Sequence, residues 1–215
     1  GMTFSDPDAL AELEASVLEA IEEVKDPLIR EKLRPQHPFG CKRPLLSNSY
    51  YTSFNRSDLE LVTDPIDRIT ENAVVTADGK ERRIDTLVIA TGFRATKYLS
   101  AIDVRGREGR SIEEAWSDGA AAYHGVTTAG FPNLFMLYGP NTNNGSIIEM
   151  IECQVDHALQ LIEHLCAEDL GWIDVRKQPM DHYNDEVQEG IQKVDVWQAG
   201  CNGYYRTPDG RIVTQ

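Results

Sequence analysis

The sequence predicts an α/β fold, in which strands of a parallel sheet alternate with amphipathic helices. The main indication is the run of residues 86–90, which is apolar or β-branched without alternation, as in a strand covered on both faces of a parallel sheet. A second run, residues 134–138, ends at Gly139 as the first ends at Gly92. Ligands of open α/β sheets bind beyond the carboxyl ends of strands, where glycine lets a cofactor approach the main chain. The alternative is that each run is a core strand ending in an ordinary turn.

The charge and composition exclude some classes of function. The formal net charge is −14, from 35 acidic and 21 basic residues, which disfavours nonspecific binding of nucleic acid. There is no signal-peptide pattern, and no apolar run reaches the ~18 residues that a membrane span needs. We therefore expect a cytoplasmic protein that binds neither nucleic acid nor membranes.

The pattern of cysteines and histidines predicts no metal site. The four cysteines are widely spaced and form no C-x-x-C motif, which favours reduced thiols over a disulfide or a zinc site. They are Cys41, Cys153, Cys166 and Cys201. His157 and His164 are seven residues apart and share a helix face, but no third ligand is nearby in the sequence.

Residues 6–33 predict two helices. Asp6 is a suitable cap, Pro7 fits a first helical position, and Pro27 separates a short helix over residues 28–33. The apolar stripe of the first helix consists of Leu10, Leu13, Val17, Ile21 and Val24. A surface helix packed on a core explains this stripe best, and a partner-binding helix is the alternative.

A proline-rich linker over residues 35–44 precedes a small β unit. Within residues 59–90, the segments 59–62, 65–69 and 73–76 predict short strands, and residues 77–80 form a hairpin-turn signal. Arg82 and Arg83 then lead into the run 86–90.

Residues 96–123 predict an irregular connecting lobe, with a strand at 102–104, a polar hairpin tip at 106–109 and a helical turn at 112–116. After the second apolar run and a polar loop, Ser146 is a natural N-cap for a helix that extends to about Cys166. Its predicted apolar face consists of Ile148, Ile151, Val155, Ala158 or Leu159, Ile162 and Leu165. A strand, a glycine turn and a helix N-terminus together present free N–H groups to an anionic group.

The tail predicts a strand at 172–175, a helix at 179–194 and a closing turn at Asp209-Gly210. The sequence thus divides into an N-terminal helical segment and linker (1–40), a central part (41–170) and an α+β tail (171–215).

Six short motifs occur in the order in which they appear in the flavin-containing and Baeyer–Villiger monooxygenases. They are Phe-Gly-Cys-Lys-Arg-Pro at 39–44, Ser-Tyr-Tyr at 49–51, Glu-Leu-Val at 60–62, Ala-Thr-Gly-Phe at 90–93, Gly-Phe-Pro-Asn-Leu-Phe at 130–135 and Gly-Pro-Asn-Thr at 139–142. The chain therefore resembles the C-terminal portion of these FAD- and NADPH-dependent enzymes. The resemblance implies a partial FAD/NAD(P)-binding, Rossmann-like flavoprotein fold with a β-meander and packed helices, and makes residues 41–170 the closing part of the NADP- and FAD-binding domains.

The resemblance also assigns roles to residues. Lys42 would match the lysine that meets the 2′-phosphate of NADP, and Arg43 the catalytic arginine that stabilises the flavin peroxide anion; the alternative is a solvated basic pair. Contacts to the flavin would come from Thr91, Gly92, Gly139, Pro140, Asn141 and Ser146. Related enzymes often carry a histidine after the glycine of the last loop, whereas here Ser146 follows Gly145 directly.

No G-x-G-x-x-G motif is present, although the resembling enzymes use two such loops to hold FAD and NADP. Three hypotheses follow: a truncated portion of a monooxygenase that inserts one oxygen atom of O2 into a ketone or onto a heteroatom, a split enzyme whose other half is a separate chain, or a non-enzymatic remnant that keeps the fold without the cofactor. We expect weak or absent activity of this chain alone. Exposed sheet edges predict a homo-oligomer or an assembly with the missing N-terminal half.

Overall fold

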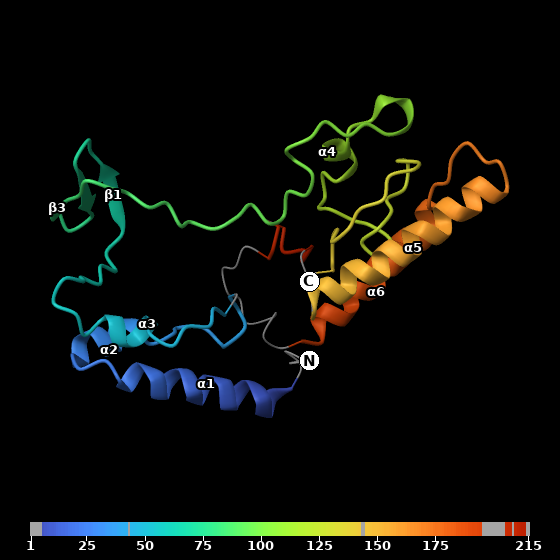
Figure 1. Cartoon of the computed structure of the whole chain (residues 1–215). Helices are drawn as coiled ribbons and strands as arrows, with labels where there is room; N and C mark the ends of the chain where they lie inside the picture. Colours follow the sequence, from blue (N-terminus) through green and yellow to red (C-terminus); the bar gives the residue numbers. More distant parts are fainter. Residues whose placement is uncertain (1–5, 43, 143–144, 195–204, 208, 214–215) are drawn as a thin grey trace. The chain divides into compact units, whose positions relative to one another are not determined.

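The computed structural model describes residues 6–42, 44–142, 145–194, 205–207 and 209–213. The chain forms two compact units, one over Pro7–Gly92 and the other over Phe93–Gln215 together with Gly1–Asp6 (Figure 1). In the described part of the chain, no helix is long and apolar enough to cross a membrane. The division at 40 and 170 made from the sequence stays a prediction.

The two helices that the sequence predicts in the Pro7–Gly92 unit are present, and a short third helix was not predicted. α1 (Pro7–Glu22) and α2 (Pro27–Leu33) are separated before Pro27, and the Asp26 side chain caps α2 by accepting a hydrogen bond from Leu28 N at 2.8 Å. Ile21 and Val24 of the predicted apolar stripe are fully buried. A short helix, α3 (Tyr50–Ser53), follows the linker.

The predicted β-meander is present as a three-stranded antiparallel sheet in the order β1-β2-β3 (Ile66–Ile69, Ala73–Thr76, Glu81–Arg83). Gly79, at φ +82°, makes the turn between β2 and β3. The strand predicted at 59–62 does not form, because this segment is held through a side chain instead. Glu60 accepts hydrogen bonds from Lys80 Nζ at 2.9 Å and from Arg82 Nη2 at 3.2 Å.

The prediction of a buried strand at 86–90 is wrong for the described part of the chain. After β3 the chain is extended but unpaired (Figure 1), and 44% of Leu87, 81% of Val88 and 75% of Ile89 are exposed. A strand interior to a sheet needs a neighbour on each side and cover on both faces. The described residues supply neither, so the local sequence gives an extended segment without a sheet.

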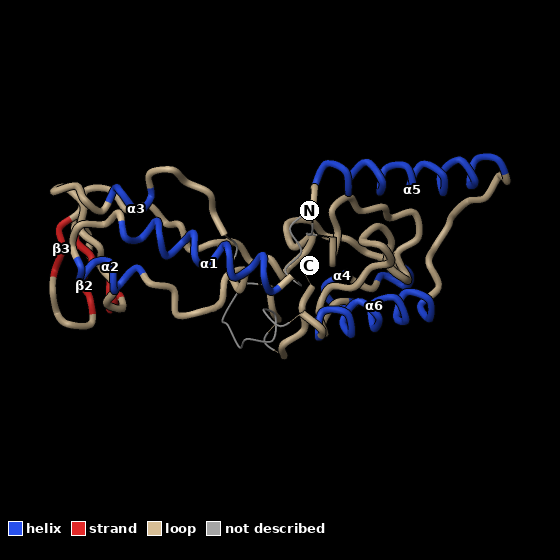
Figure 2. Tube along the Cα trace, turned by 90° about the horizontal axis from the view of Figure 1, so that it is seen from below, coloured by secondary structure: helices blue, strands red, loops and turns tan. Residues whose placement is uncertain are grey.

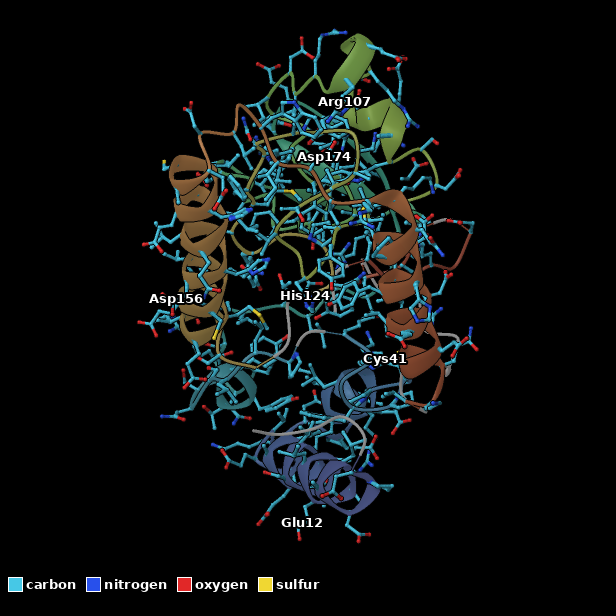
Figure 3. The ribbon with its side chains drawn as sticks, turned by 90° about the vertical axis from the view of Figure 1, so that its right-hand side faces the viewer. Glu12, Cys41, Arg107, His124, Asp156 and Asp174 are labelled. Atoms are coloured by element: carbon cyan, nitrogen blue, oxygen red, sulfur yellow. The ribbon has the colours of Figure 1, made fainter. Side chains whose placement is uncertain are left out.

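The second unit is built around two long helices, α5 (Ile147–Ala167) and α6 (Lys177–Gln192). Figures 2 and 3 show the helices on opposite sides of the loops that precede α5 in the chain. The core between them includes Ala122, Val126, Met136, Ala158 and Met180.

α5 begins as predicted, and most of its predicted apolar face is turned inward. Ala158 is buried, and Ile151, Val155 and Leu165 are half-buried, whereas the predicted members Ile148 and Ile162 are 70% and 39% exposed. The polar residue Gln154, which was not predicted to be buried, lies in the same face and bonds two loop segments, as described below.

Other strands predicted in this unit are wrong, because individual hydrogen bonds replace sheet pairing. Residues 102–104, 134–138 and 172–175 form no strand. Met136 N donates to Val126 O at 2.7 Å, and Ile173 N donates to Oδ1 of Asn133 at 3.0 Å. The predicted helical turn is confirmed as α4 (Ile112–Ala115), with a capping box between Ser111 and Glu114. The hairpin tip at 106–109 contains the 3-10 turn η1 (Arg107–Gly109), next to a bridge between Arg105 and Ser111.

The cysteines follow the prediction only in part. Cys153 and Cys166 are free thiols, but Cys41 is disulfide-bonded, so the expectation of a reduced thiol at Cys41 is wrong. Within the described ranges, no group of three His, Cys, Asp or Glu residues could hold a metal ion.

Candidate functional site

The turn that joins the second apolar run to α5 is tightly packed. Gly139 lies against the backbone of Gly125, and a Cβ at Gly139 would overlap the carbonyl oxygen of Gly125. Pro140 is fully buried, and Asn141 N donates a hydrogen bond to Val213 O at 3.0 Å. Packing alone thus requires a glycine at 139. The packed turn lies shortly before the start of α5 in the chain.

Gln154 connects α5 to this turn. Its Oε1 accepts a hydrogen bond from Tyr138 N at 2.6 Å, and its Nε2 donates to His124 O at 3.2 Å. The residue is 3% exposed, and both of its bonds are partly buried. Gln154 is not among the site residues predicted from the sequence. The signal was a glutamine between the apolar positions Ile151, Val155 and Ala158 of a helix.

The N-terminus of α5 is suited to donate hydrogen bonds to a polar group of a cofactor. Ser146 caps the helix by accepting a hydrogen bond from Glu149 N at 3.4 Å. Among the described residues, the amides of Ile147 and Ile148 have no hydrogen-bond acceptor, as expected of a first turn. Glu149 already places a negative charge in this turn. The end of α5 therefore fits the carbonyl and ring-nitrogen acceptors of a flavin better than a multiply charged phosphate.

Lys42 lies in the other unit, at a pocket of about 310 Å³. The pocket is lined by α1, the linker and α3, and its apolar residues include Val17, Leu18, Phe39 and Tyr51. Phe39 N donates to Glu14 Oε1 at 2.8 Å, which attaches the linker to α1. The pocket thus places the exposed, positively charged side chain of Lys42 beside apolar side chains. Arg43, the predicted catalytic residue, lies outside the described residues.

Thr91 and Gly92 end the extended segment of the Pro7–Gly92 unit, and both are exposed. Gly92 has φ +88°, a conformation that favours glycine, and no atom lies within 4 Å of the place of a Cβ. The space beside this backbone is therefore open to an approaching group. The structure brings Gly139, Pro140, Asn141 and Ser146 together in one unit, whereas Lys42, Thr91 and Gly92 belong to the other.

A cluster of rings joins α5 and α6 through His124, and the sequence analysis did not predict it. The His124 ring lies 4.6 Å from that of Tyr183 on α6 and 6.4 Å from that of His157 on α5, between the two helices in Figure 3. Partial burial lowers the pKa of His124, and the nearby His157 lowers it further. The neutral imidazole is thus favoured in the folded protein.

A second cluster holds the segment before α6. Asp174 is mostly buried, accepts a hydrogen bond from Arg107 Nε at 3.0 Å and another from Gly130 N at 3.2 Å (Figure 3). The guanidinium of Arg107 also lies 4.0 Å from the centre of the Trp172 ring. These contacts stabilise the unit and carry no sign of a reactive group.

Comparison with known proteins identifies the relatives of this chain. A Baeyer–Villiger monooxygenase of Pseudomonas aeruginosa is 36% identical over 219 residues, a match that covers 100% of this chain and 41% of the relative. Cyclopentanone 1,2-monooxygenase of a Comamonas species is 40% identical over 193 residues, or 83% of this chain and 35% of that enzyme. The chain is homologous to part of the Baeyer–Villiger monooxygenases. No family model matches it.

Solved monooxygenase structures share the fold of this chain. A steroid monooxygenase bound to NADP matches 97% of the chain with a TM-score of 0.84 at 30% identity, and a complex of the enzyme OTEMO with FAD and NADP matches 98% with a TM-score of 0.81 at 27% identity. The matches cover 41% and 40% of those two chains. The chain therefore has part of the flavoprotein fold of these monooxygenases and spans about two fifths of their length.

Proposed function

We propose that this chain is a part of an FAD- and NADPH-dependent monooxygenase that inserts one oxygen atom of O2 into a ketone or onto a heteroatom, and that the chain alone is inactive. The observation that carries the proposal is a match to Baeyer–Villiger monooxygenases along the whole of this chain, at 36% identity to the Pseudomonas aeruginosa relative. The rest of the catalytic apparatus lies in the part of the relatives that this chain does not match.

On this proposal, the turn at Gly139, Pro140 and Asn141 and the N-terminus of α5 at Ser146 contact the flavin. The free first-turn amides of α5 donate hydrogen bonds to acceptors on its ring system, and the positive end of the helix dipole favours electron density there. Bound FAD supplies the reactivity toward O2. The resemblance assigns further main-chain contacts with the flavin to Thr91 and Gly92, and the space beside Gly92 within its own unit is open.

Lys42 and Arg43 serve the nicotinamide cofactor and the catalysed reaction. A lysine is a compact, strongly hydrated point charge suited to a phosphate, and an arginine keeps its charge at any physiological pH. Lys42 holds the 2′-phosphate of NADP at the mouth of its pocket, and Arg43 stabilises negative charge that develops on oxygen. Both roles come from the resemblance of 39–44 to the family motif.

Substitution of Lys42 tests its role in an assembly of this chain with the part of the Pseudomonas aeruginosa relative that it does not match. Loss of a charge-assisted contact costs about 1.5–3 kcal/mol, so Lys42→Ala should raise the KM for NADPH roughly 10- to 100-fold and leave FAD content unchanged. Lys32→Ala, at an exposed lysine of α2, is the matched control. An unchanged KM in Lys42→Ala would assign the basic pair to the solvated surface.

The alternative is a non-enzymatic module that keeps the fold without the cofactor. The tight packing of Gly139 on Gly125 favours this reading at one position, because it explains the glycine without a ligand. Titration with FAD of the assembly of this chain with the unmatched part of the Pseudomonas aeruginosa relative separates the two, since a ligand that binds the native state raises its melting temperature. A rise in melting temperature and a bound-flavin spectrum support the enzyme; no change in either at high FAD concentration supports the module.

A further inference from the structure

A pocket of about 360 Å³ lies in the unit that contains Phe93–Gln215, where three segments distant in the sequence meet. The segments are 96–100, 113–120 and the turn at Thr207 and Asp209. The volume falls in the range of roughly 300–1,000 Å³ that is typical of small-molecule sites. None of the residues to which the resemblance assigns a contact with flavin or NADP lines this pocket. The proposed function therefore leaves it without a role.

One wall of the pocket is aromatic and held in place. The indole Nε1 of Trp116 donates hydrogen bonds to Ala121 O at 2.9 Å and to Thr128 Oγ1 at 3.3 Å. The Tyr98 ring lies edge-on to the Trp116 ring, with 6.5 Å between the ring centres and 82° between the planes. Two fixed rings offer an apolar surface to a ligand, and an aromatic face also attracts a cation.

The hydroxyl of Tyr98 is a hydrogen-bond donor at this pocket, and among the described residues it has no acceptor. Burial raises the pKa of Tyr98 to about 12, and the neighbouring Tyr138 raises it further. The hydroxyl therefore keeps its proton at physiological pH and can donate it in a hydrogen bond. Water or a ligand in the pocket has to supply the acceptor.

Three charged side chains of both signs surround the pocket. Lys97 precedes Tyr98 in the chain, and Glu113 and Asp209 belong to the other two segments. All three are exposed, and within the part of the chain that the structure describes none of them forms an ion pair. Opposite charges that share a pocket without touching leave room between them for a ligand that carries both signs. The second carboxylate disfavours a ligand that is only anionic.

We propose that this pocket binds a small zwitterion with an apolar body, of the size of an aromatic amino acid. Lys97 and the Tyr98 hydroxyl bind its anionic group, because an ammonium and a phenol both donate hydrogen bonds. Glu113 and Asp209 bind its cationic group, and the Trp116 ring contacts its apolar body. The site requires neither FAD nor NADP, so it goes beyond the proposed function and can be tested without it.

Three ligands of similar shape test the charge requirement. They are L-phenylalanine, phenethylamine, which lacks the carboxylate, and 3-phenylpropionate, which lacks the ammonium. Calorimetric titration of the purified 215-residue chain, without FAD, should give a Kd of about 1 mM or tighter for L-phenylalanine. Binding of the other two should be about tenfold weaker or less, because each loses a charge-assisted contact. No binding of L-phenylalanine at about 10 mM overturns the proposal, and so do equal affinities for the three ligands.

Substitutions that each remove one charge locate the site. Lys97→Met should weaken binding of L-phenylalanine about tenfold and should not weaken binding of phenethylamine, which has no carboxylate to lose its partner. Glu113→Gln should weaken both ligands that carry an ammonium, by about threefold or more, since Asp209 stays in place. Both side chains are exposed, so the melting temperature of each variant should equal that of the unsubstituted chain.

Lys193→Met and Glu163→Gln are the matched controls. They make the same changes of charge at exposed positions of the same unit, outside the pocket. Both should leave the Kd for L-phenylalanine within about twofold of its original value. If Lys97→Met binds L-phenylalanine as the unsubstituted chain does, or if a control weakens binding as much as Lys97→Met, the ligand binds elsewhere and the proposal is wrong.

Discussion

Gln154 is a polar side chain within the buried face of α5. Its two hydrogen bonds, to Tyr138 N and His124 O, connect α5 to two loop segments that lack sheet pairing. We expect Gln154→Ala to lower the free energy of unfolding by roughly 1–3 kcal/mol, because it leaves the partly buried amide of Tyr138 and carbonyl of His124 without their side-chain partner. Urea denaturation measures this change. Gln160→Ala, at an exposed position of the same helix, should change stability by less than about 0.5 kcal/mol. Equal losses in the two variants would contradict the role of Gln154.

Gly139 was predicted as a flavin contact, and the structure gives a packing reason for the same residue. Gly139→Ala should destabilise the protein by about 1–3 kcal/mol without any cofactor, because its Cβ would press on the Gly125 backbone. Gly190→Ala is the contrasting control: Gly190 lies within α6 with nothing within 4 Å of a Cβ, so alanine should stabilise by about 0.5–1 kcal/mol. Thermal unfolding of both variants without FAD measures these two changes in stability. If Gly139→Ala left the stability unchanged, packing would not explain the glycine, and contact with the cofactor would remain as the reason for it.

The contact between α5 and α6 through His124 should depend on pH. The pKa of His124 in the folded protein is below its ordinary value of 6.5, so between these two values the unfolded chain binds more protons. The contribution of His124 to stability is therefore complete above about pH 6.5 and is lost as the pH falls through the pKa of the folded state.

Melting temperatures measured from pH 7.5 to pH 5 test this expectation. The decline on acidification should be shallower in His124→Asn, since asparagine tolerates the positive φ of 51° at this position and does not titrate. His164→Asn, at an exposed histidine of α5, is the control and should follow the unsubstituted protein. Identical slopes in all three proteins would exclude His124 as the titrating group.

The accuracy of the sequence-based predictions depends on where the partners of each element lie. The break between α1 and α2 at Pro27, the turn at Gly79 and the N-cap at Ser146 were predicted, because a few neighbouring residues determine each of them. Strands at 86–90 and 134–138 were predicted from their apolar residues, yet a strand exists only with a neighbour to pair with. The burial of Gln154 in the apolar face of α5 was not predicted, because its hydrogen bonds involve residues 16 and 30 positions away.

The candidate site was predictable only in its local geometry. The glycine turn before α5 and the helix N-terminus can be read from residues 139–146, and the structure has both. The pocket of Lys42 could not be predicted, because it is assembled from α1, the linker and α3. The roles of Lys42 and Arg43 come from the family motif at 39–44, and their geometry toward a cofactor stays a prediction.

At the scale of the whole molecule, the chain matches about two fifths of the monooxygenases that it resembles. The absence of both glycine-rich loops from the sequence predicted a partial match, and the ordered motifs from 39 to 142 predicted the family. Two features of the molecule would be completed by the part of the relatives that this chain does not match. They are the unpaired run 86–90 and a candidate flavin site that lacks a motif to hold the pyrophosphate of FAD.

The first measurement to make is the visible spectrum of the complex between this chain and the unmatched part of the Pseudomonas aeruginosa relative. We expect close to one bound FAD per complex after removal of free flavin. We also expect the bound flavin to be lost, with the complex, in Val88→Glu, within the unpaired run 86–90, and kept in Leu28→Glu, at an exposed leucine of α2. A complex that forms and stays colourless in excess FAD would contradict the claim that this chain completes a flavoprotein monooxygenase.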